Sequence, residues 1–326
     1  MSGAPDTRVA VLVVGMHRSG TSALTGALGL CGATLPRRLM TAGEDNPAGF
    51  WEPRAVVALH EAMLVALGSA WDDGRIADAA RLDGWRPALA AALAEEFDDA
   101  ALLVLKDPRL SLLLEPWREV LRNAGICPRV VVALRHPMEV AASLERRDGM
   151  LLAHGLLLWL RYFLAAERGS RGMRRVFVRY DTLLADPVGC ADAIGAGLGI
   201  TWPTAPALAA GKLAGFIAPA LRHHAAVDMA LPEDVVGVAA MAGWEWGQEA
   251  ATGGAPDPAR LDAIAAQLAA ADAWLAGTLA DRQRRLGAAA REREDLAARL
   301  AAAKPLGVGR RIWRGIWRMW LRYQNK

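Results

Sequence analysis

The stretch VAVLVVGMHRSGTSALTGAL, residues 9–28, decides the fold of this chain. Its first six residues, 9–14, are an apolar run rich in valine, which is typical of a buried strand. Gly15 and Gly20 then bound a short polar loop, and apolar residues recur at helical spacing after it, so we expect a helix to begin near Gly20. A strand, a glycine-bounded loop and a helix N-terminus predict a phosphate cradle, because loop amides and the positive end of the helix dipole converge on one anion.

The loop has nearly the spacing of a Walker A motif, but it lacks the lysine of that motif. Thr21 stands where the Walker lysine would reach the β- and γ-phosphates of a nucleoside triphosphate. The cation here is Arg18, and Thr21 and Ser22 add hydroxyls at the helix start. Such a loop can hold a single phosphate or a phosphosulfate, and Arg18 could neutralise charge on the bridging oxygen as a group leaves. The alternative is an ordinary strand-to-helix turn.

The length of the chain is enough for one large α/β domain with additions. The chain has 326 residues, 53% of them hydrophobic, and shows no unbroken apolar window of bilayer length. The N-terminus lacks a charged region followed by a cleavage site, so we expect no signal peptide. The three cysteines, Cys31, Cys127 and Cys190, lie in apolar stretches without metal-ligand spacing. We therefore expect a cytoplasmic protein with reduced cysteines and no metal site.

The net charge of +3 is spread unevenly along the chain. Residues 304–326 carry seven basic residues and no acidic one, which leaves 31 basic against 35 acidic residues in the remainder. The basic character is therefore a property of the tail, and the body is not predicted to bind nucleic acid.

The loop after the first helix combines acidic and aromatic residues, which suits an acceptor-binding segment. Residues 43–53 contain two glycines and two prolines, together with Phe50 and Trp51. Glu52 is the leading candidate for a general base, because an attacking hydroxyl must lose a proton. The alternative is that Glu52 caps the helix that follows. His60, on that helix, is the second candidate for the base, against the alternative of a packing or surface histidine.

Two further strand ends carry basic residues. A buried strand over 101–105 ends in Lys106, Asp107, Pro108 and Arg109. In open parallel sheets ligands bind beyond the carboxyl ends of the strands, so Lys106 could stabilise charge on a transferred group, while Asp107 could orient Lys106 or Arg18. The alternative is a salt-bridged strand end.

A third strand over 129–134 runs into Arg135, and Ser143 follows on the next helix. An arginine fork binds a terminal phosphate with two hydrogen bonds, and the serine hydroxyl can add a third. A fourth strand over 174–178 is followed by Tyr180, which could face a nucleotide or pack in the core.

These motifs together resemble the sulfotransferases that use 3′-phosphoadenosine 5′-phosphosulfate (PAPS). The loop GMHRSGTS is similar to their 5′-phosphosulfate loop, with Arg18 where the cytosolic branch has lysine, and Arg135 with Ser143 is similar to their 3′-phosphate site, R-x-P-x(5)-S. A bacterial branch has stretches similar to Asn46-Pro47-x-Gly49-x-x-Glu52 and to Lys106-Asp107-Pro108-Arg109.

The resemblance implies an α/β fold with a doubly wound parallel sheet and a P-loop-like phosphate cradle. It implies transfer of a sulfo group from PAPS to an acceptor hydroxyl, with a glycan or cell-envelope saccharide as the expected acceptor and no metal. The implied catalytic residues are Arg18, Glu52, His60 and Lys106, and the implied donor-binding residues are Arg18, Ser19, Gly20, Thr21, Ser22, Arg135, Ser143 and Arg222. The rival functions are a P-loop kinase or nucleotide hydrolase, and a non-catalytic membrane-associated adaptor with a degenerate cradle.

The C-terminal part lies outside this resemblance, and we expect domains over 1–245, 246–303 and 304–326. Residues 243–258 are rich in glycine and proline and predict a linker. Residues 257–303 predict a long helix or helical hairpin with a loose heptad pattern that could self-associate. Residues 310–322 predict a basic, tryptophan-rich amphipathic helix that could bind an anionic membrane, so the protein could be peripheral at the inner face. The alternative is that this helix docks on the protein's own surface.

Overall fold

The computed structural model describes residues 8–41, 43, 49–75, 79–217 and 233–275. The expectations for Asn46, Pro47, Arg222 and residues 276–326 therefore lie outside the described residues. The chain divides into two compact units, Met1–Leu261 and Asp262–Lys326. Residues 258–275 are helical, and the described part of the second unit belongs to this helix.

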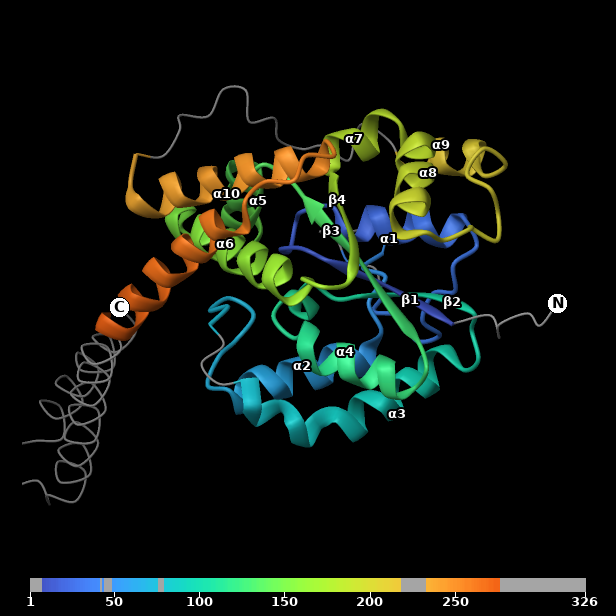
Figure 1. The fold of residues 1–326 in the computed structure, drawn as a ribbon, viewed down its shortest axis with the longest axis horizontal. Helices are drawn as coiled ribbons and strands as arrows, with labels where there is room; N and C mark the ends of the chain where they lie inside the picture. Colours follow the sequence, from blue (N-terminus) through green and yellow to red (C-terminus); the bar gives the residue numbers. More distant parts are fainter. Residues whose placement is uncertain (1–7, 42, 44–48, 76–78, 218–232, 276–326) are drawn as a thin grey trace, which may run out of the picture. The chain divides into compact units, whose positions relative to one another are not determined.

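Four parallel strands form the sheet at the centre of the first unit, in the order β2-β1-β3-β4 (Figure 1). The strands are β1 (Val9–Val14), β2 (Leu102–Lys106), β3 (Cys127–Leu134) and β4 (Arg174–Arg179). The register places Lys106 beside Val13 and Leu134 beside Arg179. Because all four strands run in one direction, the residues that follow them meet at one edge of the sheet.

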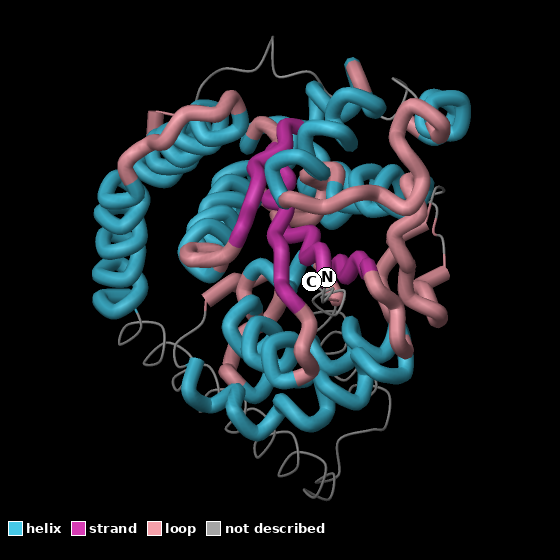
Figure 2. Tube along the Cα trace, turned by 45° about the vertical axis from the view of Figure 1, so that its right-hand side comes forward, coloured by secondary structure: helices cyan, strands magenta, loops and turns pink. Residues whose placement is uncertain are grey.

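Helices cover both faces of the sheet, as Figure 2 shows. On one face lie α1 (Thr21–Leu30), α8 (Pro187–Leu198) and α9 (Ala210–Phe216). On the other side lie α2 (Arg54–Ala66), α3 (Arg86–Phe97) and α4 (Leu114–Asn123). The remaining helices are α5 (Pro137–Asp148), α6 (Leu152–Gly169), α7 (Tyr180–Ala185) and α10 (Val235–Ala251), with short 3₁₀ helices over Ala79–Trp85 and Pro108–Ser111. The α/β prediction is confirmed.

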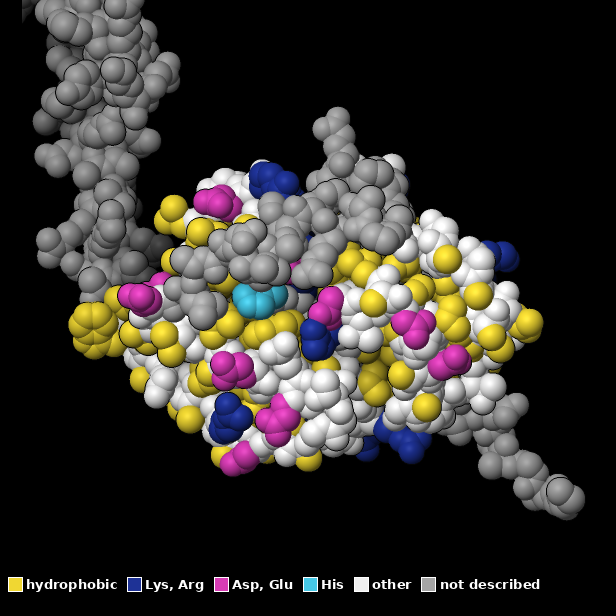
Figure 3. Space-filling model, turned by 90° about the horizontal axis from the view of Figure 1, so that it is seen from above, with side chains coloured by type: hydrophobic (Ala, Val, Ile, Leu, Met, Phe, Trp, Pro, Cys, Tyr) yellow, Lys and Arg dark blue, Asp and Glu magenta, His cyan; other side chains and the backbone are white. Residues whose placement is uncertain are grey.

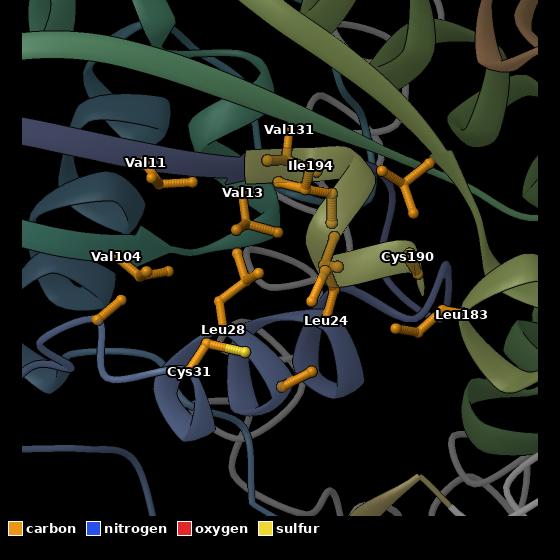
Figure 4. Packing of buried hydrophobic residues seen from close by; sticks show 14 of the residues in the cluster. Val11, Val13, Leu24, Leu28, Cys31, Val104, Val131, Leu183, Cys190 and Ile194 are labelled. Atoms are coloured by element: carbon orange, nitrogen blue, oxygen red, sulfur yellow. The ribbon is translucent and has the colours of Figure 1, made fainter. Parts of the chain in front are cut away.

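The core between α1, α8 and the sheet holds β1 in place. Val11 and Val13 of β1 point toward Leu24 and Leu28 of α1 (Figure 4), and all four side chains are buried. Two cysteines, Cys31 and Cys190, lie in the same cluster as free thiols. Burial raises the pKa of Cys190 to about 12, so this thiol stays protonated and packs as a small apolar side chain.

The expected linker over 243–258 is wrong, because α10 continues through its first half. Helix α10 packs against α6 and β4, and Trp246 is buried. A Cβ at Gly243 would lie 3.4 Å from Leu160, Phe163 and Trp159, and one at Gly247 would lie 3.1 Å from Leu134. These glycines allow a close approach between packed elements, and they do not mark a break in structure.

One face of the described residues carries side chains of both signs of charge. On the face seen in Figure 3, basic and acidic side chains are interspersed among apolar ones. Within the residues that the structure describes, no helix is both long enough and apolar enough to cross a membrane.

Candidate active site

The loop between β1 and α1 takes a glycine-dependent path. Gly15, Arg18 and Gly20 all have positive φ, at 140°, 68° and 85°. The Gly15 amide donates to Ser111 Oγ at 2.9 Å, which ties the loop to the segment after β2. Gly20 is the N-cap of α1, no side chain of the described residues caps this end, and no acidic residue lies in the first turn. The positive end of the helix dipole is therefore not offset by these side chains, which favours an anion there.

Tyr180, the residue after β4, leaves room only for a glycine at position 20, the second glycine of the loop. Its ring lies against Gly20 so closely that a Cβ at this position would overlap the ring. The guanidinium of Arg135 lies over the same ring, 4.9 Å from its centroid. Tyr180 thus packs between the loop and Arg135, so the conformation of the loop and the position of the arginine depend on one side chain.

Arg18, Arg135 and Ser143 come together beside the loop. Arg18 Nε donates to Ser143 Oγ at 2.9 Å, and Arg135 Nη1 donates to the Arg18 carbonyl at 3.1 Å. Arg135 Nε donates to Glu139 Oε2 at 2.8 Å, which aims the guanidinium. Two buried polar atoms, Arg135 Nη2 and Ser19 Oγ, have no hydrogen-bond partner among the described residues. Buried donors need acceptors, and the oxygens of a phosphate or sulfate would provide them, so these residues fit an anionic group.

Lys106 and Glu52 form a buried ion pair at the same loop. Lys106 Nζ donates to Glu52 Oε1 at 2.5 Å, to the Phe50 carbonyl at 2.9 Å and to Ser22 Oγ at 3.0 Å. These three acceptors use all three ammonium protons. Burial raises the pKa of Glu52, and the charge of Lys106 offsets part of this rise. The alternative that Glu52 caps the following helix is wrong, because Pro53 is the N-cap of α2 and no side chain caps it.

The assignment of His60 as a base is wrong, because both of its ring nitrogens are used in the interior. Nδ1 pairs with Asp107 Oδ2 at 2.8 Å, and Nε2 accepts from Trp117 Nε1 at 2.7 Å. His60 is fully buried. Since an indole nitrogen can only donate, the neutral ring carries its proton on Nδ1, and no ring nitrogen is left to take a proton from an acceptor molecule.

Asp107 belongs to the same interior network and does not orient Lys106 or Arg18. Besides the bond to His60, its Oδ1 accepts from the amide and from Nη1 of Arg109, each at 3.0 Å. Burial would raise the pKa of Asp107, but the hydrogen bond from His60 and the charge of Arg109 hold it well below its usual range. The salt-bridged strand end, given above as the alternative, therefore holds for Asp107 and Arg109.

Some site residues were missed from the sequence. His17 lies 4.9 Å from Trp71 and 6.0 Å from Tyr162 between ring centroids, and its Nε2 is buried without a hydrogen-bond partner among the described residues. Burial, reinforced by the charge of Arg109, lowers the pKa of His17 well below its usual value. Ser111 was also missed, because nothing in the sequence links its hydroxyl to an amide 96 positions away.

The other predicted residues lie as follows. Thr21 is buried at the start of α1, where its carbonyl accepts from Thr25 Oγ1 at 2.9 Å, and Ser22 Oγ faces the Phe50 carbonyl at 3.2 Å. Arg222 is outside the described residues. Across the described ranges, no group of three or more His, Cys, Asp or Glu side chains could hold a metal ion.

Comparison with known proteins gives matches to solved structures. No family model matches the chain, and neither does any curated protein. The sulfotransferase domain of the Synechococcus PCC 7002 olefin synthase is 16% identical with a TM-score of 0.42, covering 75% of this chain and 96% of that one. A sulfotransferase domain from the curacin biosynthetic pathway is 15% identical with a TM-score of 0.38, covering 80% and 98%. Sulfotransferase STF1 from Mycobacterium tuberculosis H37Rv is 17% identical with a TM-score of 0.34, covering 62% and 70%.

Proposed function

We propose that this chain is a sulfotransferase that moves a sulfo group from PAPS to an acceptor hydroxyl. The observation that carries the proposal is a pair of buried donors, Arg135 Nη2 and Ser19 Oγ, that lack partners among the described residues and lie beside the N-terminus of α1. The cation of this cradle comes from arginine, and lysine reaches the loop from the neighbouring strand β2. This arrangement suits a single phosphate or a phosphosulfate better than a triphosphate with its magnesium.

Different residues around the loop would bind the two ends of PAPS, the 3′-phosphate and the sulfo group. PAPS, when bound, supplies an activated sulfo group and a 3′-phosphate. Arg135 and Ser143 would hold the 3′-phosphate, while the amides at the start of α1, with Ser19, Thr21 and Ser22, would hold the sulfo end. Arg18 contacts Ser143, so it would reach the 3′-phosphate side as well as the bridging oxygen proposed for it.

On the acceptor side, Glu52 would take the proton of the attacking hydroxyl. Its pKa is raised by burial, which makes its carboxylate a stronger base than an exposed glutamate. Lys106 stays beside Glu52 and would exchange one of its three acceptors for an oxygen of the sulfo group as negative charge develops there. We propose a saccharide hydroxyl, of a glycan or the cell envelope, as the acceptor to test first, because GMHRSGTS resembles the loop of a bacterial branch of sulfotransferases.

Calorimetric titration with 3′-phosphoadenosine 5′-phosphate, compared with ATP and magnesium, tests this function. Binding of the bisphosphate without binding of ATP is the expected result. Magnesium-dependent binding of ATP alone would indicate a kinase or hydrolase. Binding of neither would favour the adaptor.

The variant Arg135→Ala should weaken bisphosphate binding by about thirtyfold or more, because the loss of a charged hydrogen-bond donor costs about 2 kcal/mol. Arg135→Lys should recover only part of the affinity, since lysine keeps the charge but loses the fork. The matched control is Arg118→Ala on α4, where an arginine pairs with Glu115 on the surface. Unchanged affinity in Arg135→Ala would contradict the assignment of the 3′-phosphate site.

A further inference from the structure

The segment that brings Glu52 to Lys106 has an unfavourable backbone. Trp51 has φ of 61°, a left-handed conformation that a tryptophan rarely adopts. This conformation lets the carbonyl of Phe50 and the carboxylate of Glu52 both face Lys106 Nζ, at 2.9 and 2.5 Å. Because this backbone conformation is strained for a tryptophan, other contacts must hold the segment in place.

Two contacts along α1 provide this support. Ser22 Oγ, in the first turn, donates to the Phe50 carbonyl at 3.2 Å. One turn later, Gly26 lies against the ring of Phe216 at the end of α9, and a Cβ at Gly26 would overlap this ring. The ring of Phe216 in turn contacts the indole of Trp51 edge to face, with centroids 5.9 Å apart and an interplanar angle of 81°. Residues four apart lie on one face of a helix, so Ser22 and Gly26 support the segment from the same side.

We propose that Trp51 is a positioning residue, and that its contact with Phe216, seated on Gly26, holds Phe50 and Glu52 against Lys106. The site would thus depend on α9, an element distant in the sequence from both Glu52 and Lys106. The catalytic meaning of this contact rests on the proposed function, but the contact itself can be tested without an acceptor.

Lysine acetylation with mass-spectrometric readout is the experiment, because the chain has only four lysines, Lys106, Lys212, Lys304 and Lys326. Lys106 is 1% exposed and should react slowly, whereas Lys212 is exposed and serves as the internal reference. In Trp51→Ala, the rate at Lys106 relative to Lys212 should rise by about tenfold or more, since local opening exposes the ammonium group. Trp51→Phe should restore protection, because the ring remains and Trp51 Nε1 has no hydrogen-bond partner among the described residues to lose.

A second variant tests the contact from the other side. Gly26→Ala lies inside a helix, where alanine is ordinarily more favourable than glycine. Here the methyl group would displace Phe216, so Lys106 should become more reactive. Gly215→Ala on α9 is the matched control, because a Cβ there meets open space and should leave Lys106 protected. If circular dichroism shows that Trp51→Ala is unfolded, the comparison of Gly26→Ala with Gly215→Ala decides the test.

The outcomes separate this inference from the function on which it rests. An unchanged rate at Lys106 in Trp51→Ala, an equal rise in Trp51→Phe, or an unchanged rate in Gly26→Ala would overturn the positioning role. If the wild-type chain does not bind 3′-phosphoadenosine 5′-phosphate, the proposed function fails, whatever the acetylation shows. Bisphosphate binding that stays within about twofold in Trp51→Ala supports a role on the acceptor side alone.

Discussion

At the scale of single residues, Lys106 and Asp107 are adjacent in the sequence but belong to different networks. Lys106, the last residue of β2, bonds to Glu52, Phe50 and Ser22 beside the loop. Asp107 bonds to His60 and Arg109 in the interior. Successive side chains of a strand point to opposite sides, so the end of one strand supplies a cation to the site and an anion to the core.

The pH dependence of stability should report on Asp107. A carboxyl group whose folded pKa is depressed stabilises the protein above its unfolded pKa of about 3.9, and this contribution is lost as pH falls toward the folded value. Asp107→Asn should therefore lower the free energy of unfolding by about 2–4 kcal/mol at pH 7, and the difference from wild type should narrow below about pH 4.

Urea unfolding of the wild type and of Asp107→Asn at several pH values measures this difference in the free energy of unfolding. The control is Asp83→Asn, whose side chain is 64% exposed and should show little change. A constant difference between wild type and Asp107→Asn down to pH 3 would contradict the prediction.

Part of the site could be predicted residue by residue, and part could not. Arg135 and Ser143 were expected to bind a phosphate because they resemble the 3′-phosphate motif of sulfotransferases, and the structure places Ser143 in contact with Arg18. The pairing of Glu52 with Lys106 was not predicted, because it joins positions 54 apart and local patterns carry no such information. His60 was misassigned because the sequence does not show that Asp107 and Trp117 occupy both of its nitrogens.

At the scale of elements, the loop between β1 and α1 depends on packing as much as on its own conformation. Gly20→Ala should lower the free energy of unfolding by about 2 kcal/mol or more, because a left-handed backbone is unfavourable for alanine and the added methyl group overlaps the Tyr180 ring. It should also weaken binding of the bisphosphate, since Tyr180 packs against Arg135.

The matched control for this loop is Gly172→Ala, which has a similar φ of 77° but meets open space. Gly172→Ala should lower the free energy of unfolding by only about 1 kcal/mol, the effect of the left-handed backbone alone, and should leave bisphosphate binding unchanged. Equal losses of stability and of affinity in the two variants, measured by denaturant unfolding and calorimetry, would argue against the Tyr180 contact.

The strands were easier to predict than the helical additions. The structure has β1 over Val9–Val14, as the apolar run predicted, and the other strands differ from prediction by one or two residues. Helix α10 was missed because composition cannot distinguish a glycine in a linker from one that packs. Gly243 and Gly247 are of the second kind, facing α6 and the end of β3.

At the scale of the whole molecule, the basic residues gathered in the tail suggest a function separate from the cradle. Residues 310–322 lie outside the described residues, so the membrane-binding helix stays a prediction, as does self-association through 257–303. Deletion of 307–326 should reduce sedimentation with anionic liposomes severalfold, because about 1 kcal/mol per basic residue is lost near such a surface.

Zwitterionic liposomes and added salt provide the comparison, since either should weaken association of the full chain. Undiminished association of the truncated chain with anionic liposomes would rule out the tail as the membrane anchor. Binding of the bisphosphate should be equal in both chains.

The two edges of the parallel sheet, where the strands begin and where they end, differ in the residues that they carry. The described residues proposed to act on the donor follow the carboxyl end of a strand or lie near it, whereas Gly125 and Gly172 precede β3 and β4 at the opposite end. Both are exposed, and a Cβ at either meets open space. A fluorescent protein inserted at position 125 or 172 would therefore lie at the edge of the sheet opposite the proposed donor site. The protein could then be tracked or immobilised without obstructing that site.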